Sequence, residues 1–261
     1  MLEHVNEYLH AVPLSGSTEI EVGPFTLFRS TISWPYYARP RAGQQVTAAD
    51  IELLRSACAE YDVPLAIEWV MEVCPSLGPA AREAGLTVTE HPLLVLDRAD
   101  FKPVALPPDA FTVRSLDFVE AEYAQSRAVA ELAFSDPTTA IGPAGIAERD
   151  EVALSLTAER VESQLSRAKS GVTVTVAAFG PDGIVASGAH QPVKDSTEIV
   201  AVATLPSMRR QGLAAAVTSG LVQNAYDSGI QTVLLSAQSD AVAAVYERLG
   251  FHRIGHAGAA E

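Results

Sequence analysis

The segment Glu198–Thr204 constrains the fold of this chain more than any other stretch. All the residues between its two ends are apolar, which is typical of a central strand covered on both faces. A helix is predicted next, because apolar residues recur there at every fourth position: Leu213, Val217, Leu221 and Ala225. A strand buried on both faces needs other elements packed on either side of it. The chain is therefore expected to be a mixed α/β protein.

The pattern around this segment indicates further elements of the same class. Strands are predicted over residues 111–114, 172–179, 184–192 and 232–236, and helices over 118–134, 151–168 and 240–249. The tripeptide Pro181-Asp182-Gly183 predicts a hairpin turn between two of the strands. A segment rich in Pro, Gly and Thr, Asp136–Ala147, is expected to be a loop, and loops of that length in compact domains are usually functional.

Two domains are expected in the 261 residues, with a boundary in the Pro-rich segment Phe101–Pro108. They would span residues 1–106 and 107–261. The N-terminal part has a predicted order of helix, strand and helix over residues 48–61, 64–70 and 75–84, which repeats the order over 213–228, 232–236 and 240–249. We therefore expect a smaller N-terminal α/β domain that resembles half of the C-terminal one.

Charge and composition exclude several classes of function. The chain has 18 Lys and Arg against 32 Asp and Glu, a net charge of −14, which would repel nucleic acid and attract a cationic substrate. No apolar run approaches the ~20 residues that span a bilayer, and no signal peptide is recognisable, so we expect a cytoplasmic protein. The two cysteines, Cys58 and Cys74, are expected to be reduced core residues, and no metal site is predicted.

The segment Arg209–Ala214 carries the strongest chemical signal. It leaves the buried strand and enters the helix, a junction that directs several backbone N–H groups and the positive end of the helix toward one point. Gly212 would let an anion approach the backbone closely, and Arg209 and Arg210 would add positive charge. The sequence therefore predicts a site that holds a pyrophosphate.

A tyrosine that could act as a proton donor follows this segment. Tyr246 lies in Ala244–Phe251, 246 − 212 = 34 residues after Gly212. With the preceding apolar strand, the two segments resemble the GNAT superfamily of acyl-CoA-dependent N-acyltransferases. The resemblance implies a mostly antiparallel central sheet flanked by helices, with acetyl-CoA as co-substrate.

The resemblance also implies roles for individual residues. The pyrophosphate of coenzyme A would lie on Arg209, Arg210, Gln211, Gly212, Leu213 and Ala214, and its pantetheine arm along Val202, Ala203 and Thr204. Tyr246 would donate a proton to the leaving thiolate. Glu198 would act as the general base, directly or through water, and His190 is the alternative base. Ser236 would hold water or substrate.

The sequence departs from the family pattern in two places. Ser239 stands where the family often has Asn, which puts its contact with the coenzyme in doubt. In the N-terminal part, Arg41–Val46 lacks the glycine that a phosphate site requires, and Ala81 replaces the tyrosine. That part is therefore expected to be a degenerate, non-catalytic GNAT-like domain.

Two aromatic segments of the N-terminal part remain open to interpretation. Trp34–Tyr37 and the pair Glu68-Trp69 would shape a substrate pocket or an interface, although core packing is the favoured role of Trp69.

The expected function is transfer of an acetyl group from acetyl-CoA to a primary amine, most simply of a small molecule, with the choice of acceptor made by Asp136–Ala147. Two alternatives stay open. One is a non-catalytic acyl-CoA-binding or regulatory protein, and the other is an acetyltransferase for protein or peptide amines. A homodimer is compatible with either.

Overall fold

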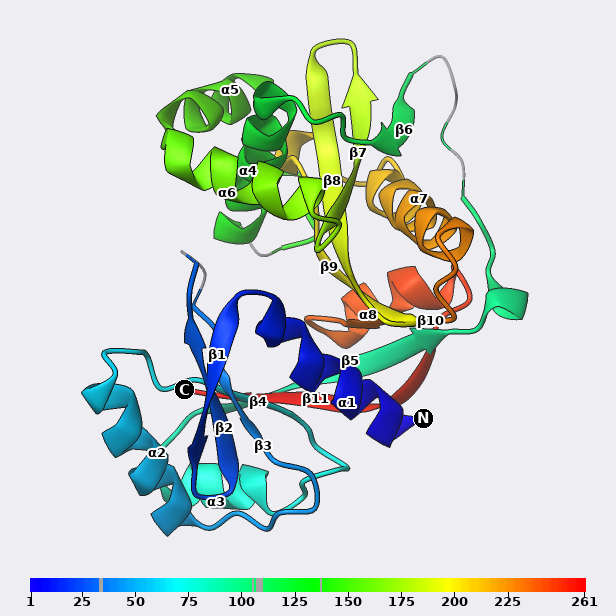
Figure 1. Cartoon of the computed structure of the whole chain (residues 1–261). Coiled ribbons are helices and arrows are strands. Elements are labelled where there is room, and N and C mark those ends of the chain that lie inside the picture. The colour runs from blue at the N-terminus through cyan, green and yellow to red at the C-terminus, as the bar shows by residue number, and fades with distance from the viewer. Residues whose placement is uncertain (33–34, 105, 107–109, 137) are drawn as a thin grey trace. The chain divides into compact units, whose positions relative to one another are not determined.

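The computed structural model describes residues 1–32, 35–104, 106, 110–136 and 138–261 (Figure 1). The chain divides into two compact units. The N-terminal unit comprises Met1–Val95, Ser236–Ala243 and His252–Glu261, and the C-terminal unit comprises Leu96–Leu235 and Ala244–Phe251. The first long segment of the N-terminal unit ends at Val95, whereas the boundary expected at residue 106 stays a prediction; residues 105, 107 and 108 of the expected Pro-rich segment lie outside the described residues.

The N-terminal unit is an α/β structure built on six strands. Its elements are α1 (Leu2–Ala11), β1 (Ser17–Val22), β2 (Phe25–Ser30), β3 (Ala38–Pro40), α2 (Ala48–Glu60), β4 (Ile67–Val70), α3 (Leu77–Glu83), β5 (Val88–Leu96) and β11 (His252–Ala260). The strands lie in the order β1-β2-β3-β4-β11-β5. All neighbours are antiparallel except β3 and β4.

One face of this sheet forms the core of the N-terminal unit with α2 and α3. Ile67 and Trp69 of β4 point into that core, so Glu68 between them faces the other side. The predicted core role of Trp69 is confirmed, since only 1% of the residue is exposed. On the other side, the buried Arg39 of β3 donates a hydrogen bond to Asn6 of α1.

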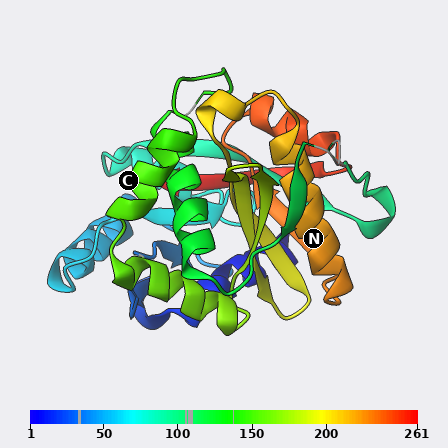
Figure 2. The same ribbon diagram turned by 90° about the horizontal axis from the view of Figure 1, so that it is seen from above.

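The C-terminal unit contains most of the predicted elements. They are β6 (Thr112–Ser115), α4 (Glu120–Ser135), α5 (Ile146–Ser155), α6 (Ala158–Lys169), β7 (Val174–Gly180), β8 (Gly183–Val193), β9 (Ser196–Thr204), α7 (Leu213–Asp227) and β10 (Thr232–Ser236); α8 (Asp240–Glu247) follows. The strands lie in the order β10-β9-β8-β7-β6, and only β9 and β10 are parallel. Figure 2 shows α4 and α6 on one side of β7–β9 and α7 on the other.

The predicted single helix over residues 151–168 is wrong, because α5 and α6 are separate helices. Leu156 and Thr157 between them are both extended, with ψ of 137° and 144°. Thr157 directly precedes α6, at a position where the backbone is extended and where threonine is a favoured residue. The first of the two helices also starts earlier than expected, since Glu148 accepts a hydrogen bond from the Gly145 N–H and closes the first turn.

The two parts of the chain share the predicted order of elements. Helix, strand and helix occur as α2, β4 and α3 in one part and as α7, β10 and α8 in the other, and each series is followed by a strand, β5 or β11. The expected buried strand over Glu198–Thr204 is β9, and the predicted mixed, mostly antiparallel fold is confirmed.

Candidate active site

Strands β9 and β10 run side by side for only part of their length. Their pairing covers Ser196–Glu198 of β9 and ends at Glu198 opposite Leu234, whereas β9 continues to Thr204. Glu198 therefore lies at the last paired position, where the two parallel strands part. The segment from Ile199 onward has its backbone edge turned toward the space that the parting opens.

A β-bulge interrupts β9 just beyond this point. Val200 pairs with Ala189 of β8 and Ala203 pairs with Ser187, so two residues of β9 face one of β8. Ala201 has a left-handed backbone with φ of 54°, which is uncommon for a residue other than glycine. A bulge leaves the extra residue out of the ladder of hydrogen bonds and turns its backbone groups elsewhere. The bulge could not be predicted from the residues, because alanine has no preference for that conformation.

The segment that follows β9 forms the predicted turn into α7. Arg210 and Gly212 both have left-handed backbones, with φ of 68° and 80°. Gly212 precedes the first residue of α7, and no side chain caps this end of the helix. The first N–H groups of the helix therefore have no partner from the helix or from a capping side chain. Arg210, Gln211 and Gly212 are exposed, so the turn is open to a ligand.

Thr204 provides a further sign that a ligand lies along this path. Its Oγ1 is buried and has no hydrogen-bond partner among the described residues. A buried hydroxyl without a partner is costly, which makes it a natural partner for an amide of a bound arm. This hydroxyl could bind an amide of the pantetheine arm of coenzyme A, and the uncapped helix end could bind its pyrophosphate.

The Arg209 side chain is engaged within the protein. Only 9% of the residue is exposed, and its guanidinium donates to the Asp136 carboxylate, to a backbone carbonyl in the last turn of α4 and to two backbone carbonyls of the loop that follows. The predicted contact of Arg209 with the coenzyme stays a prediction. Because the guanidinium is engaged within the protein, only the backbone of Arg209 is available for that contact.

Tyr246 lies in the last turn of α8 and is half-buried. Its ring packs edge-on against Phe251, with the two ring centres 6.0 Å apart. Burial raises the pKa of its phenol to about 12, because the phenolate would lose its solvation. The side chain therefore holds its proton at neutral pH, as a proton donor must.

His190 has a structural position. It is buried, one ring nitrogen lies 2.9 Å from the Thr197 hydroxyl, and the other lies 3.0 Å from the Asn224 side-chain oxygen. Burial lowers the pKa of the imidazole. With both nitrogens engaged, His190 is a poor candidate for the base compared with Glu198, which is partly exposed.

The two serines of the prediction belong to the N-terminal unit. Ser239 caps the start of α8, since its Oγ accepts a hydrogen bond from the Val242 N–H at 3.4 Å. Ser236 is the last residue of β10 and is exposed. Their predicted contacts with coenzyme or substrate stay predictions.

The helix that corresponds to α7 in the N-terminal part has a closed end. Thr47 caps α2 by accepting from the Asp50 N–H, and the Asp50 carboxylate accepts from the Thr47 N–H. Side chains thus already bind N–H groups at this helix start. Ala81, which stands where the other half has Tyr246, is fully buried in the core. Both observations support the proposal that this part does not bind coenzyme A.

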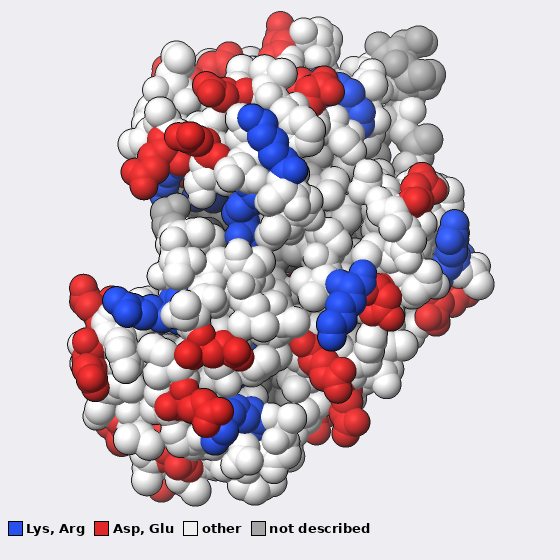
Figure 3. Space-filling view, in the orientation of Figure 1, with Lys and Arg blue, Asp and Glu red and all other residues white. Residues whose placement is uncertain are grey.

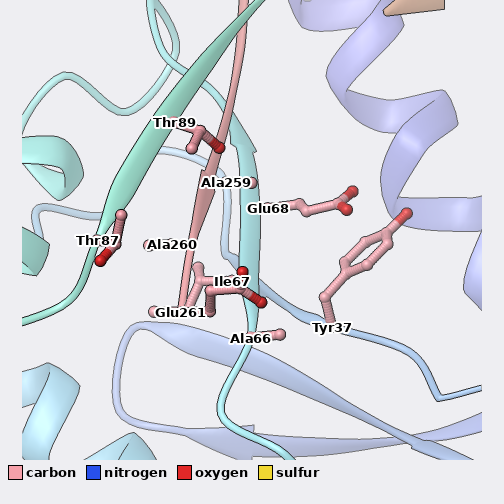
Figure 4. Close-up of a pocket in the computed structure, with 9 residues that line it drawn as sticks. All are labelled: Tyr37, Ala66, Ile67, Glu68, Thr87, Thr89, Ala259, Ala260 and Glu261. Atoms are coloured by element: carbon pink, nitrogen blue, oxygen red, sulfur yellow. The ribbon is translucent and has the colours of Figure 1, made fainter. Parts of the chain in front are cut away.

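A pocket lies in the N-terminal unit, beside strands β4, β5 and β11 (Figure 4). Its lining residues are Tyr37, Ala66, Ile67, Glu68, Thr87, Thr89, Ala259, Ala260 and Glu261. The Glu68 carboxylate points toward the Tyr37 hydroxyl. Burial raises the pKa of Glu68, although the charge of Arg39 and a hydrogen bond from Tyr37 oppose the shift. Two residues that the sequence singled out thus line one pocket; Trp34 lies outside the described residues.

The described part of the chain gives no sign of a metal or of a membrane span. None of its helices is both long enough and apolar enough to cross a bilayer. Among the same residues, no group of three or more His, Cys, Asp and Glu side chains could hold a metal ion. Cys58 and Cys74 are free and buried, as predicted.

Comparison with known proteins agrees with this geometry. Residues 186–258, less than a third of the chain, match the family model described as FR47-like protein. Among solved structures, the chain is similar to a GCN5-related N-acetyltransferase from Kribbella flavida, with 21% identity and a TM-score of 0.75, over 100% of this chain and 95% of that one. A search of curated proteins found no significant match.

Two further solved structures share the architecture. A GCN5-related N-acetyltransferase from Sphaerobacter thermophilus is 16% identical with a TM-score of 0.58, over 92% of this chain and 81% of that one. A tandem GNAT protein from the clavulanic acid biosynthesis pathway is 13% identical with a TM-score of 0.57, over 90% and 77%.

These likenesses show the fold: the chain has the fold of the GNAT superfamily, as the resemblance implied. Within that fold, its residues 186–258 are FR47-like. The matched segment begins in β8 and includes Glu198, the turn at Gly212 and Tyr246, which are the residues on which the resemblance was based.

Proposed function

We propose that this protein is an acetyl-CoA-dependent N-acetyltransferase that acts on a primary amine of a small molecule. The observation that carries the proposal is the course of β9. This strand parts from β10 after Glu198, bulges at Ala201 and leads into an uncapped helix end at Gly212. Such a path offers backbone N–H groups to a thioester at one end and to a pyrophosphate at the other.

The chain's own residues then perform the proton transfers. When bound, acetyl-CoA supplies an activated acyl group. Glu198, directly or through water, accepts a proton from the amine, whose nitrogen forms a bond to the acyl carbon. Backbone N–H groups near Val202 stabilise the negative charge on the acyl oxygen. As the carbon–sulfur bond breaks, Tyr246 gives its phenolic proton to the sulfur and later regains one from solvent.

The acceptor is proposed to be cationic because the chain is acidic. Acidic side chains are spread over the face seen in Figure 3, with Lys and Arg scattered among them. A net charge of −14 attracts ammonium groups and repels nucleic acid. The loop that follows α4 is proposed to select the acceptor.

Titration calorimetry of acetyl-CoA into the wild type and Gly212→Glu tests the coenzyme assignment. The variant adds a carboxylate at the helix start, where it would repel phosphate, and it places a side chain on a backbone with φ of 80°. We expect the Kd to rise on the order of 100-fold, about 2.7 kcal/mol.

Gly229→Glu is the matched control, because Gly229 has φ of 89° at the other end of α7 and nothing lies within 4 Å of an added Cβ. It should bind acetyl-CoA as the wild type does. Amine-dependent release of free thiol across a panel of amines would then establish the enzyme. Binding without release across the panel favours the alternative, a non-catalytic acyl-CoA-binding protein. A wild type that does not bind acetyl-CoA contradicts the proposal.

A further inference from the structure

The segment Arg209–Ala214, proposed to hold the pyrophosphate, is here called the phosphate turn. The Arg209 guanidinium joins it to the loop after α4, here called the acceptor loop (residues 136 and 138–145). Its Nη1 donates to Asp136 Oδ2 at 2.9 Å and to the Ala140 carbonyl at 3.0 Å, with Thr138 Oγ1 at 3.4 Å. Its Nη2 donates to the carbonyls of Ala133 and Asp136 at 3.2 and 2.8 Å. A planar guanidinium reaches acceptors on several sides at once, which a lysine ammonium cannot do in the same geometry.

Backbone hydrogen bonds extend the same junction. The Gly142 N–H donates to the Pro206 carbonyl at 3.1 Å, and the Ser207 N–H donates to the Ala144 carbonyl at 2.9 Å. The acceptor loop thus runs along the segment that connects β9 to α7. The connection is made by residues that lie about 70 positions apart in the chain.

Two large apolar side chains lie exposed beside this junction, one at the end of α4 and one in the acceptor loop. Phe134 and Ile141 are 56% and 66% exposed, and each directly follows a residue whose carbonyl Arg209 binds. Loops without such anchors are mobile, so the anchor decides which surface the loop presents.

We propose that Arg209 is a positioning residue, whose guanidinium fixes the acceptor loop against the phosphate turn so that coenzyme and acceptor are held by one connected segment. Arg210, the neighbouring and exposed arginine, is then the cation that faces the phosphates. The effect on the acceptor rests on the proposed function, whereas the anchoring of the loop does not.

Hydrogen exchange of the full chain, measured by mass spectrometry, tests the anchoring. Arg209→Lys keeps the charge but loses the planar set of donors, and Asp136→Ala removes the carboxylate partner of Arg209 while every residue of the phosphate turn stays unchanged. Both variants should speed exchange in peptides with the Gly142 and Ser207 amides by at least about tenfold. Arg160→Lys is the control, because Arg160 is an exposed arginine of α6 that lies 3.8 Å from Glu131. Unchanged exchange in both variants overturns the proposal.

Steady-state kinetics and calorimetry test the consequence for the acceptor. In Asp136→Ala the KM of the amine should rise about tenfold, while the Kd of acetyl-CoA changes less than about threefold. Faster exchange with an unchanged amine KM overturns the positioning role. If Arg209→Lys weakens acetyl-CoA as much as Arg210→Gln does, with exchange unchanged, Arg209 is a direct phosphate contact instead. A wild type that fails to bind acetyl-CoA refutes the proposed function only, because the exchange result still decides the anchoring.

Discussion

Tyr246 keeps its proton throughout the pH range in which an acetyltransferase would be assayed. Its pKa of about 12 exceeds that of a thiol, about 8.5, so full transfer to a free thiolate would be uphill. The proton is therefore best given while the carbon–sulfur bond is breaking and the sulfur is gaining charge.

Tyr246→Phe removes this proton and little else. We expect kcat to fall by more than roughly tenfold while the Kd of acetyl-CoA stays nearly unchanged. Ionisation of Tyr246 would remove activity only as the pH rises toward about 12, so the wild-type profile of kcat should show no decline from this group between about pH 8 and 10. Initial rates over that range check both points. An unchanged kcat in the variant would remove Tyr246 from the mechanism.

Some of these residues could be predicted from the sequence and others could not. The turn at Gly212 could be predicted, because it depends on local sequence: a glycine stands between the apolar pattern of a buried strand and that of a helix. The anchoring role of Arg209 could not, since its main partner Asp136 lies 73 positions away in the chain. His190 likewise shows its role only through Asn224, 34 positions further on.

At the scale of single elements, β9 combines regular pairing with one strained residue. A left-handed backbone raises the free energy of an L-amino acid by about 1–2 kcal/mol, whereas glycine adopts it without that penalty because it has no Cβ. Ala201 thus stores strain next to the place where the thioester is proposed to lie.

Substitutions at Ala201 should reveal this strain. Ala201→Gly is expected to be neutral or to stabilise the protein by up to about 1 kcal/mol, whereas Ala201→Val should destabilise it by about 2 kcal/mol, because a branched side chain resists that backbone. Ala189→Val serves as comparison, since Ala189 lies in the neighbouring strand β8, where it pairs with Val200 of β9. Urea unfolding measures both effects, and equal losses in the two valine variants would argue against strain at the bulge.

Periodicity predicted the longer elements well and the irregular ones poorly. The strand β10 has the predicted bounds, and α7 differs from its prediction by one residue. Their apolar patterns are regular, because one face of the helix and both faces of the strand are buried. The split between α5 and α6 was missed, since the apolar spacing continues across Leu156. The bulge at Ala201 was missed for the same reason: it changes the path of the backbone and leaves the pattern of residues intact.

At the scale of the whole molecule, the net charge of −14 should act on the rate of encounter. The field of the chain attracts cations over a distance that shrinks from about 10 Å at 0.1 M salt to about 3 Å at 1 M. For accepted substrates, kcat/KM of a polyamine should fall with added salt more steeply than that of a monoamine, while kcat stays constant. Initial rates at several salt concentrations test this, and parallel declines would show that the overall charge does not guide the acceptor.

The place of β11 could not be predicted, because it follows from the path of the whole chain. Residues 252–260 come late in the sequence, yet they pair with β4 and β5 in the N-terminal unit. Chain length and composition indicate how many units to expect, and they say nothing about which distant segment completes each one.

This strand has a consequence for biosynthesis. A ribosome releases residues 1–95 long before residues 252–260, so the N-terminal sheet waits with an unfilled place between β4 and β5 while the rest of the chain is made. Pairing across so many residues is slow to form and leaves strand edges exposed in the meantime. For the same reason, a gene divided between the two expected domains would give an N-terminal product without β11, the strand that joins β4 to β5.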